Sequence, residues 1–192
     1  MPVPKREMRH RVKRLLAELP AEERRARSAL IQAKLLREAR FQAATVLAAY
    51  ASFGTEVVTD AVLAECLAGS KTLLLPRMKP DGCTLSFHRV AALADLETNA
   101  FGIREPRAAA PEVAVETVDF LLVPGMAFSD SGERLGRGAG YYDRILARIP
   151  ATACALAIAY DMQLFPSGYF ETEVHDRRVQ RVLTEAREIR LD

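Results

Sequence analysis

The sequence predicts an α/β fold, with a mostly parallel or mixed central sheet, helices on both faces and a helical N-terminus. Two observations lead to this prediction. Short apolar runs of strand length alternate along the chain with segments whose apolar residues recur every three or four positions. The apolar runs are unbroken, which is typical of strands buried on both faces of a parallel sheet. At 192 residues the chain is long enough to bury a substantial core, and we expect one domain spanning residues 1–192.

The N-terminal segment is predicted to form two helices. Residues 3–19 place Pro4 at the first helical position, where its missing N–H is not needed. The apolar stripe of this helix consists of Met8, Val12, Leu15, Leu16 and Leu19. Pro20 ends the helix, and residues 21–41 are predicted to form a second helix with acidic residues in its first turn.

Four long apolar runs are predicted to form the central strands, and a short fifth run follows near the C-terminus. These runs are residues 45–52, 71–77, 119–128, 153–160 and 180–185. Pro76 is expected to stop the second run, because proline cannot donate to a sheet ladder. Residues 83–90 are predicted to form a strand with alternating burial, and helices are predicted over residues 58–70 and 141–149.

The composition excludes several classes of protein. The formal net charge of +2 is too small for a surface that binds polyanions over the whole molecule. Cys66, Cys83 and Cys154 are far apart and match neither a disulfide framework nor a zinc site, which favours a reducing compartment. No apolar run approaches the roughly 20 residues of a membrane span, and the N-terminus lacks the apolar segment of a secretory signal. We therefore expect a cytoplasmic protein without a membrane partner.

The most unusual stretch is "RLGRGAGYYDRIL", residues 134–146, which follows a predicted strand. Its glycines are Gly136, Gly138 and Gly140. They allow positive φ and let successive N–H groups face one side as a nest for an anion. A helix beginning near Tyr141 would direct its positive end the same way, and Arg134 and Arg137 add charges suited to phosphate oxygens. The spacing matches neither a P-loop nor a dinucleotide fingerprint. The alternative is a flexible connection between a strand and a helix.

Two acids and the N-terminal helix extend this candidate phosphate site. Asp143 follows the glycines and Asp176 precedes the last predicted strand, and such carboxylates can hold Mg²⁺ against phosphates. Asp143 could instead complement the dipole of its helix. Lys5 and Arg9 lie one helical turn apart, so both project from one face, which is either directed at the phosphates or simply solvated. His175 is a candidate general acid or base, or a structural residue.

Seven motifs distributed over the chain carry a resemblance to a known family. They are "KREMR" at residues 5–9, "YASFGTEVVT" at 50–59, "LLLPR" at 73–77, "FGIREP" at 101–106, "VPGMAFSDSGERLGRGAGYYDRIL" at 123–146, "YDMQLFP" at 160–166 and "EVHDRRVQRVLTE" at 173–185. With these motifs the sequence resembles the 5-formyltetrahydrofolate cyclo-ligase (methenyltetrahydrofolate synthetase) family. The resemblance implies an enzyme that uses ATP and Mg²⁺ to convert 5-formyltetrahydrofolate to 5,10-methenyltetrahydrofolate, releasing ADP and phosphate. ATP would phosphorylate the formyl oxygen, and the nitrogen at position 10 would attack the activated carbon.

The resemblance also implies roles for individual residues. ATP would contact Lys5, Arg9, Arg134, Leu135, Gly136, Arg137, Gly138, Ala139, Gly140, Tyr141 and Tyr142. The folate would contact Glu56, Arg137, Gly138, Ala139, Gly140 and Tyr141. Glu56 would accept hydrogen bonds from the N–H donors at the pterin edge. Asp143 and Asp176 would bind Mg²⁺. Arg134, Arg137 and Tyr141 would act in catalysis, and Tyr160 and Gln163 are candidates for the pocket wall.

Two other functions fit the same residues. A non-catalytic relative on this fold would bind RNA or a nucleotide through its basic N-terminal helix and the arginines near residues 176–181. The near-neutral charge and the lack of a basic sheet with interleaved aromatic residues argue against a nucleic-acid partner. An enzyme acting on another phosphate-bearing metabolite would not need Glu56 as a pterin-pairing acid. The expected partner is a small-molecule substrate, and the expected assembly is a monomer or a weak homodimer.

Overall fold

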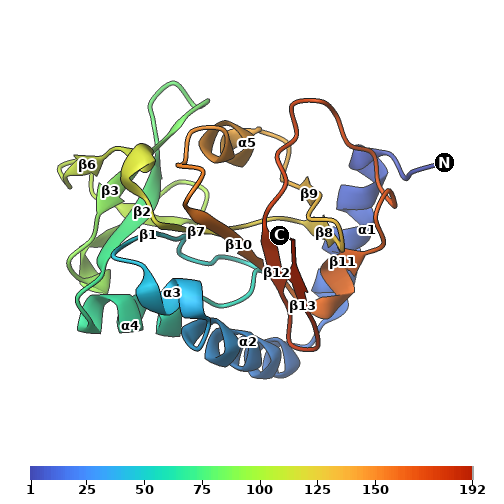
Figure 1. The fold of residues 1–192 in the computed structure, drawn as a ribbon, viewed down its shortest axis with the longest axis horizontal. Helices are drawn as coiled ribbons and strands as arrows, with labels where there is room; N and C mark the ends of the chain where they lie inside the picture. The colour runs from blue at the N-terminus through green and yellow to red at the C-terminus, as the bar shows by residue number, and fades with distance from the viewer. Residues whose placement is uncertain (192) are drawn as a thin grey trace.

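A computed structural model describes residues 1–191, in which an eight-stranded mixed sheet is flanked by five α-helices (Figure 1). The helices are α1 (Lys5–Glu18), α2 (Ala21–Leu36), α3 (Ala39–Ala43), α4 (Asp60–Ala68) and α5 (Tyr141–Leu146), with short 3₁₀ turns η1 (Leu93–Asp95), η2 (Val115–Thr117) and η3 (Asp161–Gln163). The strands are β1 (Val46–Ala48), β2 (Thr72–Met78), β3 (Leu85–Arg89), β4 (Leu96–Thr98), β5 (Arg104–Pro106), β6 (Glu112–Val113), β7 (Phe120–Val123), β8 (Ala127–Ser129), β9 (Arg134–Leu135), β10 (Cys154–Ile158), β11 (Leu164–Phe165), β12 (Arg181–Leu183) and β13 (Glu188–Arg190).

The order of strands in the main sheet is β13-β12-β10-β7-β1-β2-β3-β6. The central strands β12, β10, β7, β1 and β2 are parallel to one another. The edge strands β13, β3 and β6 are antiparallel to their neighbours. Parallel neighbours need crossover connections, and α4 provides the one between β1 and β2. The predicted α/β class and mixed sheet are confirmed.

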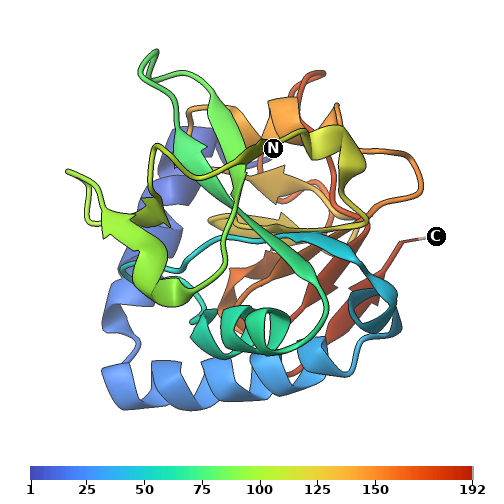
Figure 2. The ribbon, with the colours of Figure 1, turned by 90° about the vertical axis from the view of Figure 1, so that its left-hand side faces the viewer.

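The two faces of the sheet carry different amounts of helix. Residues of α1, α2, α3 and α4 share one core cluster and residues of α5 belong to the other, and Figures 1 and 2 show α2 and α4 along one side with α5 opposite. Along β7, Phe120 and Leu122 pack in the first cluster, whereas Leu121 and Val123 pack in the second. All four side chains are fully buried. Helices on both faces are therefore confirmed. The apolar pattern of β7 is unbroken because both faces of this strand are covered by core residues.

The boundaries of the N-terminal helices differ from the prediction in two places. α1 buries most of its predicted apolar stripe, but Pro4 is the N-cap residue, one position before the helix begins. The second predicted helix is divided, because α2 ends at Leu36 and α3 is a separate short helix. Glu38 caps α3 by accepting a hydrogen bond from Phe41 N. Within residues 1–191, no helix combines the length and the apolar character needed to cross a bilayer.

The prediction that Pro76 stops its strand is wrong, since β2 continues to Met78. β1 pairs with β2 only as far as Leu74, so beyond that residue β2 has a partner strand on one side alone. Leu74 O accepts from Ala49 N on the β1 side, and Pro76 faces the same side because residues alternate along a strand. No amide is needed there, which is the condition under which a strand tolerates proline.

Two other strands end earlier than predicted, and the segments that follow them line the cavity described below. β1 ends at Ala48, and the chain then leaves the sheet until α4 begins. β7 ends at Val123, before Pro124 and Gly125, and the chain resumes as β8 in a separate sheet of order β11-β8-β9. A Cβ atom on Gly125 would lie 2.5 Å from the Phe128 ring, so the turn requires glycine.

β3 departs from the predicted alternation of burial. Ser86, Phe87 and His88 are all buried. Phe87 packs in the core cluster of the α5 face, whereas His88 hydrogen-bonds Ser86 and Ala110 O. Both faces of this edge strand are thus covered.

Candidate functional site

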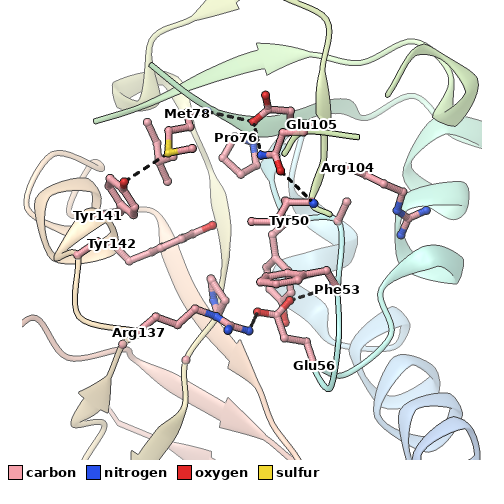
Figure 3. A pocket seen from close by; sticks show the side chains of 18 of the residues that line it. Tyr50, Phe53, Glu56, Pro76, Met78, Arg104, Glu105, Arg137, Tyr141 and Tyr142 are labelled. Carbon is pink, nitrogen blue, oxygen red and sulfur yellow. Dashed lines mark hydrogen bonds and ion pairs between the residues drawn. The ribbon is translucent and has the colours of Figure 1, made fainter. Parts of the chain in front are cut away.

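A cavity of about 200 Å³ lies beyond the carboxyl ends of β1, β2 and β7 (Figure 3). Its apolar and aromatic walls include Tyr50, Phe53, Pro76, Met78, Leu85, Ile103, Pro124, Tyr141 and Tyr142. Its charged residues are Glu56, Arg104, Glu105, Arg134 and Arg137. In open parallel sheets the connecting loops gather at this end of the strands and ligands bind there. Many of the predicted site residues therefore line one cavity.

Two of the three loop glycines have the positive φ that was predicted. φ is 114° at Gly138 and 66° at Gly140. Gly136 is different, and the prediction for it is wrong, because its φ is not positive. A Cβ atom on Gly136 would lie 2.8 Å from Arg134 Nη1. A side chain at residue 136 would therefore have to displace the Arg134 guanidinium, whereas the backbone conformation of Gly136 does not itself call for glycine.

Two arginines hold the carbonyl oxygens of this glycine loop, residues 136–140. Arg9 Nε donates to Gly136 O at 2.9 Å, and Arg144 Nη2 donates to Ala139 O at 3.1 Å. In the part of the chain that the structure describes, the N–H groups of residues 136–140 make no hydrogen bond. A run of free N–H groups beside cations is an arrangement that binds anions. α5 begins at Tyr141 as predicted, although with six residues it contributes only a short dipole.

Arg134 is buried beneath the glycine loop instead of extending from it. Its side chain is 3% exposed, and Nη2 donates to Asp143 Oδ1 at 2.7 Å. The same carboxylate oxygen accepts from Arg177 N at 3.1 Å, which brings Asp143 next to the segment carrying Asp176. Asp143 Oδ2 has no hydrogen-bond partner among residues 1–191. That oxygen is directly available to a ligand.

Lys5 pairs with Asp176, the other predicted metal ligand, at 2.7 Å, and also with Glu173 at 3.2 Å. Burial alone would lower the pKa of Lys5, but its hydrogen bonds to the two carboxylates raise it. Burial would likewise raise the pKa of Asp176, but hydrogen bonds from Lys5 and from Glu173 N lower it. Both groups are thus ionised near neutral pH. His175 is 66% exposed and lies beside Glu173, 3.1 Å away.

The structure brings both predicted magnesium ligands to the glycine loop but pairs each with a cation. Asp143 bonds to Arg134, and Asp176 bonds to Lys5. No group of three or more His, Cys, Asp and Glu side chains within residues 1–191 is arranged to hold a metal ion. Carboxylates from separate segments with phosphate oxygens between them remain suitable for Mg²⁺, which keeps several non-protein ligands. Magnesium binding by these two residues stays a prediction.

Glu56 and Arg137 form an ion pair between two cavities. Arg137 Nη2 lies 2.9 Å from Glu56 Oε1, and its guanidinium stacks 4.4 Å from the centre of the Phe53 ring. Burial raises the pKa of the Glu56 carboxyl, and the charge of Arg137 and the Phe53 N–H only partly oppose this. Figure 3 shows the pair at one end of the cavity. Both residues also line a second cavity of about 250 Å³.

Basic side chains of α1 lie beside this ion pair. Lys13 lines the second cavity, and Arg9, His10 and Lys13 line a third, shallower one of about 180 Å³ together with Arg137. Lys5 and Arg9 project from the same helix face, as predicted, and reach residues 176 and 136 respectively. The glycine loop therefore has cations on the α1 side and the mostly apolar cavity on the other.

Tyr141 and Tyr142 have different surroundings although they are consecutive. The Tyr141 hydroxyl donates to Gly82 O at 2.6 Å and lies 3.5 Å from Met78 Sδ, so it holds the β2–β3 turn. Tyr142 extends across the cavity, and Figure 3 shows its hydroxyl directed toward the wall that carries Tyr50 and Pro76. The Tyr142 hydroxyl is buried and has no partner in the described chain.

Several residues of the site were missed by the sequence reasoning. The β4–β5 hairpin covers one end of the cavity with Asn99, Ile103, Arg104 and Glu105, and Met78 and Leu85 come from β2 and β3. The available signal was the motif "FGIREP", which contains the end of the β4–β5 turn and all of β5. Of the proposed wall residues, Gln163 lines the second cavity. Tyr160 is fully buried and is not among the residues that line these cavities. Its hydroxyl contacts Ser28 Oγ and Glu56 O, so it holds the segment that carries Glu56.

Comparison with known proteins points to one family. A model of the 5-formyltetrahydrofolate cyclo-ligase family matches residues 2–185. The mouse 5-formyltetrahydrofolate cyclo-ligase is 29% identical over 191 residues, covering 94% of this chain and 93% of the mouse protein. The protein of the same name from Mycolicibacterium smegmatis is 36% identical over 150 residues, covering 73% of this chain and 74% of its own.

Two solved structures have the same fold. The 5,10-methenyltetrahydrofolate synthetase of Aquifex aeolicus superposes with a TM-score of 0.84 and 36% sequence identity, covering 97% of this chain and 92% of its own. The structure of a 5,10-methenyltetrahydrofolate synthetase from Mycoplasma pneumoniae gives a TM-score of 0.76 at 18% identity, covering 94% and 98% of the two chains. At that identity the second likeness concerns the fold alone.

The Arg134–Asp143 pair makes a prediction about stability. Asp143→Ala is expected to lower the free energy of unfolding by about 3 kcal/mol, because it leaves a guanidinium that is 3% exposed without its partner. Urea unfolding without nucleotide measures this loss. Glu116→Ala is the matched control, since it breaks a 2.9 Å pair with Arg148 in which both side chains are half exposed. Equal effects of the two substitutions would contradict the structural role of Asp143.

Proposed function

The chain belongs to the 5-formyltetrahydrofolate cyclo-ligase family and is a ligase, and from that premise we propose that it converts 5-formyltetrahydrofolate to 5,10-methenyltetrahydrofolate at the expense of ATP. The observation that carries the proposal is the meeting of two unlike surfaces at the glycine loop. One surface presents free N–H groups and cations, which suit phosphates. The other is a mostly apolar cavity with Glu56 at one end, which suits a flat heterocycle with N–H donors.

The phosphate side supplies positioning and charge. The free N–H groups of residues 136–140 would hold the phosphate oxygens, with Lys5, Arg9 and Arg137 close by. Phosphoryl transfer is catalysed mainly by alignment and charge neutralisation, with little covalent chemistry from the protein. Arg134 would act from beneath the loop, because its buried guanidinium holds Asp143 and lies close to Gly136.

The carboxylates of the site fit a hard cation. Asp143 is held in place by Arg134 and Arg177 N through one oxygen, which leaves Oδ2 free to bind. Asp176 would exchange part of its contact with Lys5. Mg²⁺, when bound, neutralises charge on the phosphates. Lys5, once released from part of its contact with Asp176, would be able to pair with a phosphate oxygen.

The folate side supplies orientation. Glu56 would accept hydrogen bonds from the adjacent N–H donors of the pterin ring, which requires the Arg137 pair to open or to shift. Arg137 released from Glu56 would turn toward the phosphates, since it lines all three cavities. Opening the pair would therefore prepare both subsites at once.

The chemistry follows from this alignment. The formyl oxygen forms a bond to the terminal phosphorus while the bond from that phosphorus to ADP breaks. The nitrogen at position 10 then attacks the formyl carbon and loses its proton, and the carbon–oxygen bond breaks to release phosphate. An amide-like oxygen is a poor leaving group until it is phosphorylated. Exclusion of water by the apolar walls would protect the phosphorylated intermediate from hydrolysis.

A coupled assay tests this function directly. The purified protein with Mg·ATP and 5-formyltetrahydrofolate is expected to form methenyltetrahydrofolate, followed by its absorbance in the near ultraviolet, and ADP in equal amount. Removal of ATP, or of Mg²⁺ by a chelator, is expected to stop the reaction. Absence of product with all components present would overturn the proposal, and product without ATP would overturn its phosphoryl-transfer step.

The raised pKa of Glu56 gives a pH dependence. Only the ionised carboxylate accepts from both N–H donors, so the affinity for folate is expected to hold above this pKa and to fall as the pH drops through it. Below the pKa the decrease approaches about tenfold per pH unit, as for one linked proton. Calorimetric titration over a pH series measures the profile. Glu56→Gln is expected to abolish the fall of folate affinity at low pH, whereas the control Glu116→Gln is expected to retain it. The same fall of affinity in Glu56→Gln would show that another group causes it.

A further inference from the structure

The Tyr142 hydroxyl is an exception in this molecule. Within residues 1–191, only two buried side-chain polar atoms have no hydrogen-bond partner, Tyr142 Oη and Arg134 Nε. Both residues line the same cavity, and the Arg134 guanidinium lies 6.0 Å from the centre of the Tyr142 ring. Folded proteins satisfy nearly all of their buried polar groups, so two exceptions in one place need an explanation.

The hydroxyl of the neighbouring Tyr141, unlike that of Tyr142, has a hydrogen-bond partner in the protein. Tyr141 uses its hydroxyl within the protein, on Gly82 O. Tyr142 turns to the interior of the cavity, where its hydroxyl faces the wall of Tyr50 and Pro76 (Figure 3). Pro76 has no N–H, and its side chain has no polar atom. Tyr50 carries a hydroxyl, but it makes no hydrogen bond with Tyr142, so within residues 1–191 the Tyr142 hydroxyl stays unpaired.

The electrostatic surroundings make this hydroxyl a donor. Burial raises the pKa of Tyr142, and the negative charge of Glu56 raises it further. A neutral phenol with no partner in the protein is ready to donate to an acceptor on a ligand.

We infer that Tyr142 is a substrate-binding residue, whose hydroxyl donates a hydrogen bond to a carbonyl oxygen of the ligand that Glu56 holds by its N–H donors. The inference rests on the proposed function and deepens it. It also changes the expectation for the two tyrosines: Tyr141 holds the wall of the cavity, and Tyr142 contacts the folate. A pterin ring carries a carbonyl beside its N–H donors, and the formyl group carries a second one on the same side of the ring. Either oxygen has the required chemistry.

Binding to the full-length protein without nucleotide tests the inference, since no turnover then occurs. Tyr142→Phe is expected to weaken the binding of 5-formyltetrahydrofolate about five- to tenfold, as expected for loss of one neutral hydrogen bond. Because the hydroxyl has no partner in the protein, the same substitution is expected not to lower the midpoint of urea unfolding. Tyr169→Phe is the matched control, because Tyr169 lies outside the cavity, where it stacks on Phe165 and contacts Arg11. The Tyr169→Phe variant should bind 5-formyltetrahydrofolate as tightly as the wild type.

A second ligand identifies the oxygen. 5-Methyltetrahydrofolate retains the ring carbonyl but has no formyl oxygen. If Tyr142→Phe weakens the binding of both folates, the acceptor is the ring carbonyl, and if it weakens only that of the formyl compound, the acceptor is the formyl oxygen. Unchanged binding of both compounds, or a loss of affinity explained by a lower unfolding midpoint, would overturn the inference. If the wild type itself binds neither compound, the proposed function fails and the inference fails with it.

Discussion

The site depends on the orientation of five peptide units, residues 136–140. Arg9 and Arg144 hold the carbonyl oxygens of Gly136 and Ala139 from two sides, and the N–H groups of the loop are left without partners in the described chain. An unpaired N–H group normally costs stability when it is buried, and these are placed at the surface between cavities. The fold thus keeps a set of donors free at a point where side chains from several separate segments meet.

The charges around this loop are balanced in pairs. Three cations proposed to serve phosphate are bonded to three carboxylates proposed to serve the metal or the pterin: Lys5 with Asp176, Arg134 with Asp143, and Arg137 with Glu56. The pairs differ in exposure, from the buried Arg134 to the half-exposed Arg137. We propose that the Lys5 and Arg137 pairs exchange partners when ligands arrive, whereas the pair of the buried Arg134 keeps the loop in place. Such pairing would prevent repulsion among the cations before nucleotide binds.

The sequence predicted the central strands and the loop better than the contacts between distant segments. The apolar runs of β7 and β10 indicated strands buried on both faces, and they are central in the sheet. Pro76 was misjudged because the length of the neighbouring β1 decides whether its missing N–H matters. Gly136 was misjudged because this position is crowded by the Arg134 side chain and does not have a positive φ. The Arg137–Glu56 pair joins residues 81 positions apart, and no local pattern predicts such a contact.

Amide chemical shifts of the isotopically labelled protein test the central claim most directly. Titration with a non-hydrolysable ATP analogue and Mg²⁺ is expected to shift the N–H resonances of Gly136, Gly138 and Gly140 more than those of glycines outside the site, such as Gly69 and Gly168. Large shifts elsewhere, with the resonances of residues 136–140 unchanged, would contradict the assignment of this loop to the phosphates.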